Sequence, residues 1–301
     1  MEQPIIDLPT VQDYCRVLGV KALHPLVSVI DMSTLAPMKN DLKRFGFYCI
    51  FYKEITCGTM MYGRSKYDYE DGTLLFIGPG QVVGSANPTV FPHPKGMILM
   101  FHPDLLYGTP LARRMRDYTF FSYDSNEALH MSEREKVIIL NCFNEIKEEL
   151  EYAIDKHTRQ IVASNIETLL NHCVRFYDRQ FVTREMVNNG VVEKFNLFLQ
   201  NYFDSGKAQE QGLPTVKACA ENAFLSANYF GDLIKKMTGK SAIENIQLFT
   251  INRAKELLAD TDLSISQIAY ELGYSYPHHL TRIFKKVAEI TPGEFRKNVK
   301  G

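Results

Sequence analysis

The sequence predicts an α+β fold: an N-terminal antiparallel β-barrel, then a helical segment, then an all-α domain made of two helix-turn-helix motifs. Three observations support it. Short apolar runs bounded by turn residues fill residues 1–130, segments of helical period fill residues 131–203, and an internal repeat lies in residues 213–301. The polar, glycine-flanked residues 204–212 are the predicted linker between the last two parts.

Composition sets the broad class. The chain has 301 residues, 45% hydrophobic and 23% charged, which is ordinary for a soluble globular protein. No apolar run reaches the ~18 residues of a membrane span, and the N-terminus MEQPIIDLPT shows no signal peptide. The six cysteines are scattered without a CxxC pair, as expected for reduced thiols. A cytoplasmic protein that does not contact a membrane is therefore expected.

The first 130 residues show strand signals. Apolar runs at residues 44–55, 73–83 and 96–102 are bounded by turns such as EDG and GPG, which is typical of a small barrel or sandwich. A helix is expected from Thr10 to Leu18, because Thr10 and Asp13 have the spacing of a capping box.

Two long helices are predicted next. Ser132 and Glu135 form a second capping box, and a further helix is expected from near Thr158 to Phe176. Their apolar faces have two interpretations, which can both hold: packing on the barrel, or pairing with a second copy of the chain. Residues 131–203 are therefore the expected dimerisation segment of a homodimer.

The internal repeat has two copies. The first, TVKACAENAFLSANYFGDLIKKMTGKS, starts at Thr215, and the second, SISQIAYELGYSYPHHLTRIFKKVAEIT, starts at Ser264. Each reads as a capped short helix, a tight turn and a second helix, the pattern in which the second helix enters the DNA major groove. Gly273 suits the second turn, whereas the first has Ala223-Phe224. A connecting helix of roughly 18 residues, about 27 Å, would hold the motifs about one DNA turn apart.

These motifs resemble the AraC/XylS family of bacterial transcription regulators. The resemblance rests on LSANYFGDLIKKMTGKS, RAKELLADTDLSISQIAYELGYS and HLTRIFKKVAEITPGEFRK. It implies a DNA-binding domain at residues 213–301, a cupin-like regulatory barrel at residues 1–130, double-stranded DNA and RNA polymerase as partners, a small-molecule effector, and often a dimer.

The resemblance also implies which side chains face DNA. Adjacent histidines lie about 100° apart on a helix and grip one metal poorly, so the alternatives of a metal site and a buried pair are weaker than a DNA-facing role. Asp232 departs from the family pattern: it either accepts from a cytosine amine or is a solvated charge. The DNA-binding candidates are Asn228, Asp232, Lys235, Lys236, Tyr276, His278, His279, Thr281, Arg282 and Lys285. The segment from Gly212 onward is mildly basic, with 12 Lys and Arg against 9 Asp and Glu.

The front domain offers no catalytic pattern. It lacks the H-x-H spacing of a cupin metal site, a G-x-S-x-G nucleophile motif and a glycine-rich phosphate loop, so no enzyme activity, metal or cofactor is expected. Its aromatic residues form either an effector pocket or plain core. The pocket candidates are Tyr48, Tyr52, Tyr62, Arg64 and Tyr67. The alternatives to an effector-responsive regulator are a metal-dependent cupin enzyme with an accessory DNA-binding domain, and a DNA-binding scaffold whose barrel senses nothing.

Overall fold

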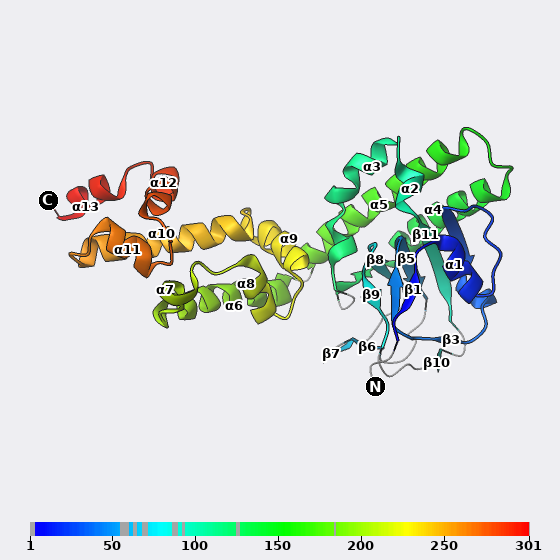
Figure 1. Cartoon of the computed structure of the whole chain (residues 1–301), viewed down its shortest axis with the longest axis horizontal. Helices are drawn as coiled ribbons and strands as arrows, with labels where there is room; N and C mark the ends of the chain where they lie inside the picture. The colour runs from blue at the N-terminus through cyan, green and yellow to red at the C-terminus, as the bar shows by residue number, and fades with distance from the viewer. Residues whose placement is uncertain are drawn as a thin grey trace. The chain divides into compact units, whose positions relative to one another are not determined.

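The structure is a computed structural model that describes residues 4–54, 60–62, 65–67, 72–85, 90–91, 94–124, 127–183 and 185–300. The chain divides into two compact units, Met1–Gln180 and Phe181–Gly301. The first unit combines strands and helices, and the second is all-helical in its described residues (Figure 1). None of the described helices has the length and apolar character needed to cross a membrane.

A five-stranded antiparallel sheet is the centre of the first unit. Its order is β12 (Leu129–His130), β8 (Thr73–Ile77), β5 (Tyr48–Lys53), β11 (Gly96–Phe101) and β2 (Val27–Asp31). A three-stranded sheet joins β1 (Ile6–Leu8), β4 (Lys43–Phe45) and β9 (Val82–Val83). Two short ribbons pair β3 (Met38–Lys39) with β10 (Val90–Phe91), and β6 (Met60–Tyr62) with β7 (Ser65–Tyr67).

The predicted antiparallel barrel is therefore wrong in two respects. The described strands form separate sheets that do not close on one another, because β12 and β2 remain the outer strands of the large sheet. In addition, β1 pairs with β4 in parallel, Ile6 opposite Lys43 and Leu8 opposite Phe45. The antiparallel pairing predicted within residues 44–102 is present: β5 pairs with both β8 and β11 in register.

The two faces of the large sheet bury different partners, because successive side chains of a strand point to opposite faces. On one face, Phe51, Ile77 and Met100 pack with Phe45 of β4 and with Tyr14 of helix α1 (Val11–Val17). The predicted capping box of α1 is present, with Thr10 accepting from the backbone N–H of Asp13. Short helical turns follow β2 and β11: η1 (Met32–Thr34), α2 (Pro103–Leu106), α3 (Pro110–Arg114), η2 (Met115–Asp117) and η3 (Thr119–Ser122).

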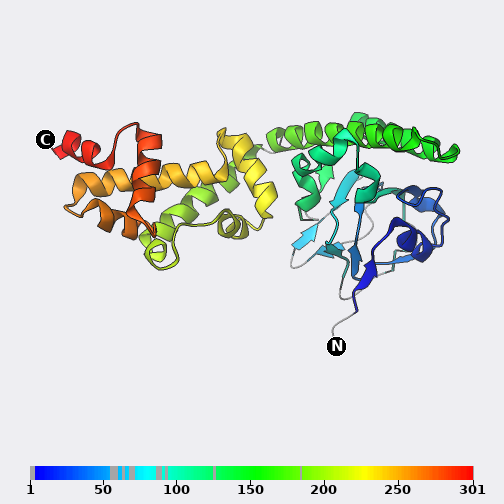
Figure 2. The same cartoon turned by 45° about the horizontal axis from the view of Figure 1, so that its top comes forward.

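Helices α4 (Glu133–Glu151) and α5 (Thr158–Thr183) lie across the other face of the sheet (Figure 2). The Phe76 ring lies 6.1 Å from the Tyr177 ring of α5, and the predicted capping box of Ser132 and Glu135 starts α4. Phe143 and Leu169 are fully buried within the unit. The apolar faces of both helices therefore pack on the first unit, as the first of the two interpretations predicted.

The second unit begins with α6 (Glu185–Asp204) and α7 (Lys207–Gln211). The linker predicted at residues 204–212 contains helix α7, with Ala208 buried. The Tyr202 hydroxyl donates to the Gly212 carbonyl oxygen at 3.0 Å, which ties the end of this segment to α6.

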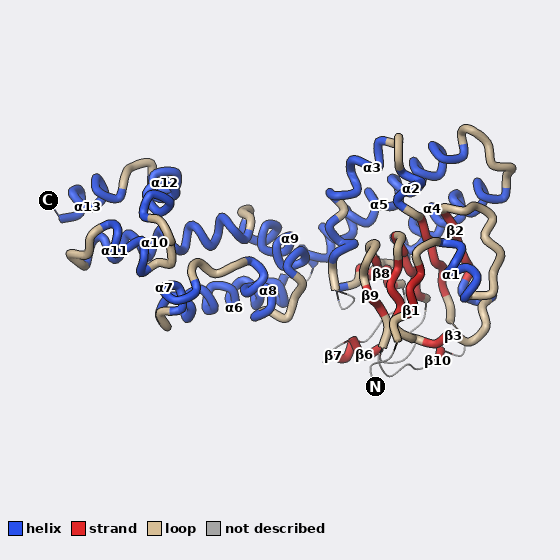
Figure 3. The backbone as a smooth tube through the Cα atoms, in the orientation of Figure 1, coloured by secondary structure: helices blue, strands red, loops and turns tan. Residues whose placement is uncertain are grey.

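The two helix-turn-helix motifs follow (Figure 3). The first comprises α8 (Val216–Asn222) and α9 (Ala227–Thr238), and the second comprises α11 (Ile265–Glu271) and α12 (Pro277–Ala288). Helix α10 (Ala242–Asp260) connects them, and α13 (Pro292–Lys300) ends the described chain. Thr215 and Ser264 are the N-caps of α8 and α11, as predicted.

Candidate nucleic-acid interface and ligand pocket

Helix α12 presents an aromatic cluster at its N-terminal end. Tyr276 is the N-cap, Pro277 occupies the first turn, and Tyr276 and His278 are exposed whereas His279 is half-buried. The two imidazole rings lie 4.4 Å apart at 74°, and the Tyr276 ring lies 5.6 Å from His278 and 5.7 Å from His279. The histidines therefore pack on each other and on Tyr276 at the exposed end of the helix.

The next turns of α12 separate core from surface. Leu280 and Phe284 are fully buried, Thr281 is half-buried with its hydroxyl donating to the Pro277 carbonyl at 3.3 Å, and Arg282 is exposed. Within the described residues, the side chains of Arg282 and Lys285 make no hydrogen bond or ion pair. Both cations are thus available to an external anion.

Helix α9 has the same core and a different surface. Phe230 and Leu233 are buried, Asn228 and Lys235 are exposed, and Asp232 is half-buried. Lys236 is exposed as well. The repeat places Asp232 where α12 carries Arg282, so the two equivalent surfaces differ by two charges. Gly231 precedes Asp232, and a Cβ built there would meet nothing within 4 Å.

Helix α10 supplies the shared core. Ile251, Ala254 and Leu258 pack with Leu280 and Phe284 of the second motif. Its 19 residues correspond to about 28 Å at 1.5 Å per residue, close to the predicted length. The spacing between the motifs is therefore set by one uninterrupted helix with a capping box of Ser241 and Glu244 at its start.

The second motif contacts a segment that sequence reasoning did not connect with it. Gly273 in its turn has φ +85°, and a Cβ built there would lie 2.6 Å from the Ala208 carbonyl oxygen and 3.0 Å from the Leu213 nitrogen. The corresponding turn of the first motif places Phe224 at φ 60° with 82% of its surface exposed. In the sequence, the glycine at position 273 is the one signal that indicates this close approach of the turn to residues 208–213.

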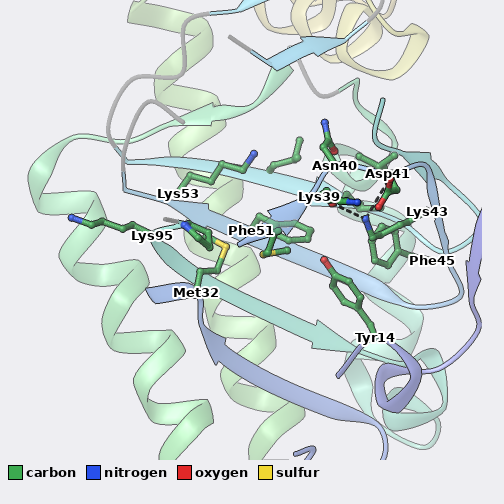
Figure 4. Close-up of a pocket in the computed structure, with 15 residues that line it drawn as sticks. Tyr14, Met32, Lys39, Asn40, Asp41, Lys43, Phe45, Phe51, Lys53 and Lys95 are labelled. Atoms are coloured by element: carbon green, nitrogen blue, oxygen red, sulfur yellow. Dashed lines mark hydrogen bonds between the residues drawn. The ribbon is translucent and has the colours of Figure 1, made fainter. Parts of the chain in front are cut away.

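The first unit contains a pocket between its two larger sheets (Figure 4). Its empty volume is about 720 Å³, including the part open to solvent. Apolar side chains from α1, β4, β5, β8 and β9 form its walls, and several lysines also line it. The lining residues are Tyr14, Met32, Met38, Lys39, Asn40, Asp41, Lys43, Phe45, Phe51, Lys53, Leu75, Ile77, Val83, Pro94 and Lys95.

Lys43 is the buried cation of this pocket. It is 8% exposed, and its ammonium donates to the backbone carbonyls of Lys39 at 3.0 Å and Asp41 at 3.3 Å (Figure 4). Burial lowers the pKa of Lys43, and the smaller attraction of Asp41 acts in the opposite direction. Among the described residues, no carboxylate forms an ion pair with it.

The predicted pocket residues lie elsewhere. Tyr48 and Tyr52 alternate with Phe51 on β5, so they point to the helix-covered face of the sheet and do not line the pocket. The Tyr48 ring stacks on Phe101 at 5.0 Å, and burial raises its pKa. Tyr62 and Tyr67 belong to β6 and β7, but their side chains, like the whole of Arg64, lie outside the described residues.

The described residues contain no group of three His, Cys, Asp or Glu side chains that could hold a metal ion. Five described cysteines are free and buried. Burial raises the pKa of the Cys219 thiol to about 12, which keeps it protonated near neutral pH.

Comparison with known proteins addresses the C-terminal motifs. Residues 219–298 match the helix-turn-helix domain family. Residues 219–298 therefore form a helix-turn-helix domain. The HTH-type transcriptional regulator YtdP of Bacillus subtilis is 34% identical over 83 residues, covering 28% of this chain and 11% of that protein. The regulatory protein PocR of Salmonella typhimurium is 30% identical over 98 residues, covering 33% of this chain and 31% of that protein.

The helix-turn-helix domain is also similar to a solved structure, the C-terminal domain of AraT, a response regulator from Geobacillus stearothermophilus. The identity is 29%, the TM-score is 0.32, and the match covers 36% of this chain and 84% of that one. The chain spans less than a third of the length of either regulator named above.

Proposed function

We propose that this protein is a sequence-specific, DNA-binding transcription regulator whose two helix-turn-helix motifs contact double-stranded DNA in the cytoplasm. The observation that carries the proposal is the helix-turn-helix domain itself: two exposed recognition helices, α9 and α12, on one rigid connecting helix. Of the two proteins that it resembles in this domain, YtdP is named as an HTH-type transcriptional regulator and PocR as a regulatory protein.

The two motifs are proposed to contribute unequally. Arg282 is exposed and unpaired within the described residues, so its guanidinium can bond a guanine edge with two hydrogen bonds. Lys235, Lys236 and Lys285 are exposed and suit phosphate contacts. Asp232 repels phosphate and is proposed to contribute little unless it meets a cytosine amine.

Binding sites selected from randomised DNA by the full chain provide the test. Arg282→Ala should weaken binding to the selected site by about 5- to 150-fold and relax base preference at one or two positions, because a bidentate pair gives ~1–3 kcal/mol of discrimination. Asp232→Ala, the matched substitution in the other motif, should cost less than about threefold. Equal losses would show that the first motif also reads bases, and no loss from Arg282→Ala would remove α12 from the interface.

The remaining parts of the proposal concern regulation. Residues 1–130 are proposed to form the regulatory domain, and residues 131–203 to contribute to a homodimer interface. Val137 supports the dimer, because it is 58% exposed on the outer side of α4. A small-molecule effector is proposed to bind the pocket between the sheets, and RNA polymerase is the proposed target of the DNA-bound protein.

A further inference from the structure

We propose that the pocket of the first unit takes an organic monoanion with an apolar body, such as a carboxylate on a hydrocarbon, and that the Lys43 ammonium is its countercharge. This inference rests on the effector role in the proposed function and names the chemical class of the effector.

Lys43 is a buried charge with no ion-pair partner among the described residues. Buried ammonium groups are normally paired with carboxylates, because transfer out of water without a partner is expensive. Lys43 is 8% exposed, and its hydrogen-bond acceptors are two neutral backbone carbonyls. An ammonium has three donors, so one N–H remains after these two bonds. A carboxylate in the pocket would supply the third acceptor and a negative charge bonded directly to the ammonium.

The walls of the pocket are apolar. Phe45, Phe51, Leu75 and Ile77 line the pocket and belong to the buried core of the unit. Tyr14 enters from α1 with its ring 5.2 Å from that of Phe45, and its hydroxyl end points toward the pocket (Figure 4). An inorganic anion would leave these walls in contact with water, whereas a hydrocarbon body would cover them at about 25 cal/mol per Å² of apolar surface removed from water.

The opening of the pocket carries an excess of positive charge among the described residues. Lys39 and Lys95 line the pocket and are exposed, and Lys53 lines it as well, whereas Asp41 is the only carboxylate among the described residues that line it. A rim with this excess of positive charge attracts anions and disfavours cations. A neutral ligand would gain nothing from Lys43, so the charge selects against neutral molecules of the same shape.

Calorimetric titration of the full chain with octanoate, octan-1-ol and acetate separates the two contributions. Octanoate should bind at least tenfold more tightly than octan-1-ol, which has the body without the charge, and than acetate, which has the charge without the body. Equal binding of octanoate and octan-1-ol would overturn the role of the charge. Equal binding of octanoate and acetate would overturn the role of the walls, and absence of octanoate binding would reject the proposal.

Two variants assign the countercharge. Lys43→Met keeps the length of the side chain and removes the charge, so it should lose at least tenfold in octanoate affinity while octan-1-ol affinity stays within about twofold. Lys95→Met, an exposed lysine of the same pocket, should lose less than about threefold. Unchanged octanoate affinity in Lys43→Met would overturn the assignment of Lys43.

DNA binding of each variant, measured without ligand on the selected site, should match that of the unmodified chain. This measurement distinguishes failure of the proposed DNA-binding function from failure of the proposed ligand class. If the unmodified chain binds no DNA, the proposed function fails whatever the pocket binds. If it binds DNA and no octanoate, only the ligand class fails.

Discussion

Gly273→Ala is expected to destabilise the second unit far more than Gly239→Ala, although both substitutions add one methyl group at a glycine of positive φ. Gly273 has φ +85° and Gly239 has φ +73°. The left-handed conformation costs a non-glycine residue about 1–2 kcal/mol, and the lower entropy of the unfolded alanine chain returns about 0.4–1 kcal/mol. Gly239→Ala should therefore lower the free energy of unfolding by about 1.6 kcal/mol or less.

Gly273 carries an additional steric cost. A Cβ at Gly273 would lie 2.6 Å from the Ala208 carbonyl oxygen and 2.8 Å from the Gly212 carbonyl carbon, whereas a Cβ at Gly239 would meet nothing within 4 Å. The contacting atoms at Gly273 are backbone, so relief requires a shift of the chain, which typically costs about 1–3 kcal/mol. The total for Gly273→Ala is about 1–4.6 kcal/mol.

Scanning calorimetry of the full chain measures the difference. A loss of 1 kcal/mol lowers the melting temperature of a domain of this size by about 4 °C, so Gly273→Ala should lower it by about 4–18 °C and Gly239→Ala by about 6 °C or less. Hydrogen exchange adds a local readout: residues 207–213 should lose protection only in Gly273→Ala. Equal melting temperatures in the two variants would refute the packing of this turn on α7.

Further predictions address the two cores and the outer face of α4. The Tyr274 hydroxyl is buried and has no hydrogen-bond partner in the described chain, and burial raises its pKa to about 12. Tyr274→Phe should therefore leave the free energy of unfolding unchanged or raise it by about 1 kcal/mol in urea titrations. A fall in the free energy of unfolding by more than about 1 kcal/mol would contradict this prediction. Burial lowers the pKa of Lys43 below that of the unfolded chain, so its contribution to stability should rise as pH increases through the folded pKa towards about 10.4, and the difference between the unmodified chain and Lys43→Met should shrink over that range. A constant difference would show that Lys43 keeps its unfolded pKa. Val137→Glu should shift sedimentation towards the monomer without lowering the melting temperature, whereas Leu169→Ala, at a fully buried position, should cost about 2–5 kcal/mol. An unmodified chain that already sediments as a monomer would place no interface at Val137.

Local patterns in the sequence predicted the helical parts well. The capping boxes predicted at Thr10 and Ser132 are both present, because a capping box is a contact between residues three apart. Ser264, predicted as an N-cap, caps α11. The repeat was readable for the same reason, since each motif closes its own turn. The helix in residues 204–212 was missed because its polar composition does not reveal that the chain packs under Gly273, about 60 positions later.

The pocket required non-local information. Tyr48 and Tyr52 were predicted as pocket residues because they are aromatic. Side chains alternate along β5, however, so Phe51 faces the pocket and the two tyrosines face the other side of the sheet. This alternation is visible in the sequence and could have shown that Tyr48 and Tyr52 face away from Phe51. The role of Lys43 could not have been predicted from the sequence. Its burial depends on the parallel pairing of β1 with β4, and its hydrogen bonds go to the carbonyls of residues 39 and 41. The barrel prediction was wrong because the closure of short strands into a barrel depends on strand pairings that no local pattern in the sequence specifies.

Helix α10 constrains the angle between the two motifs as well as their distance. Its 19 residues run without a break from the cap at Ser241 to Asp260, so the motifs cannot rotate independently about it. In B-form DNA, each added base pair turns the following site by about 35° and moves it by about 3.4 Å, since a turn takes 10–10.5 base pairs over 34–36 Å. A single inserted base pair between the two contact sites would thus carry the second groove out of reach by torsion. Regulatory sites for this protein should vary in base sequence more readily than in phase.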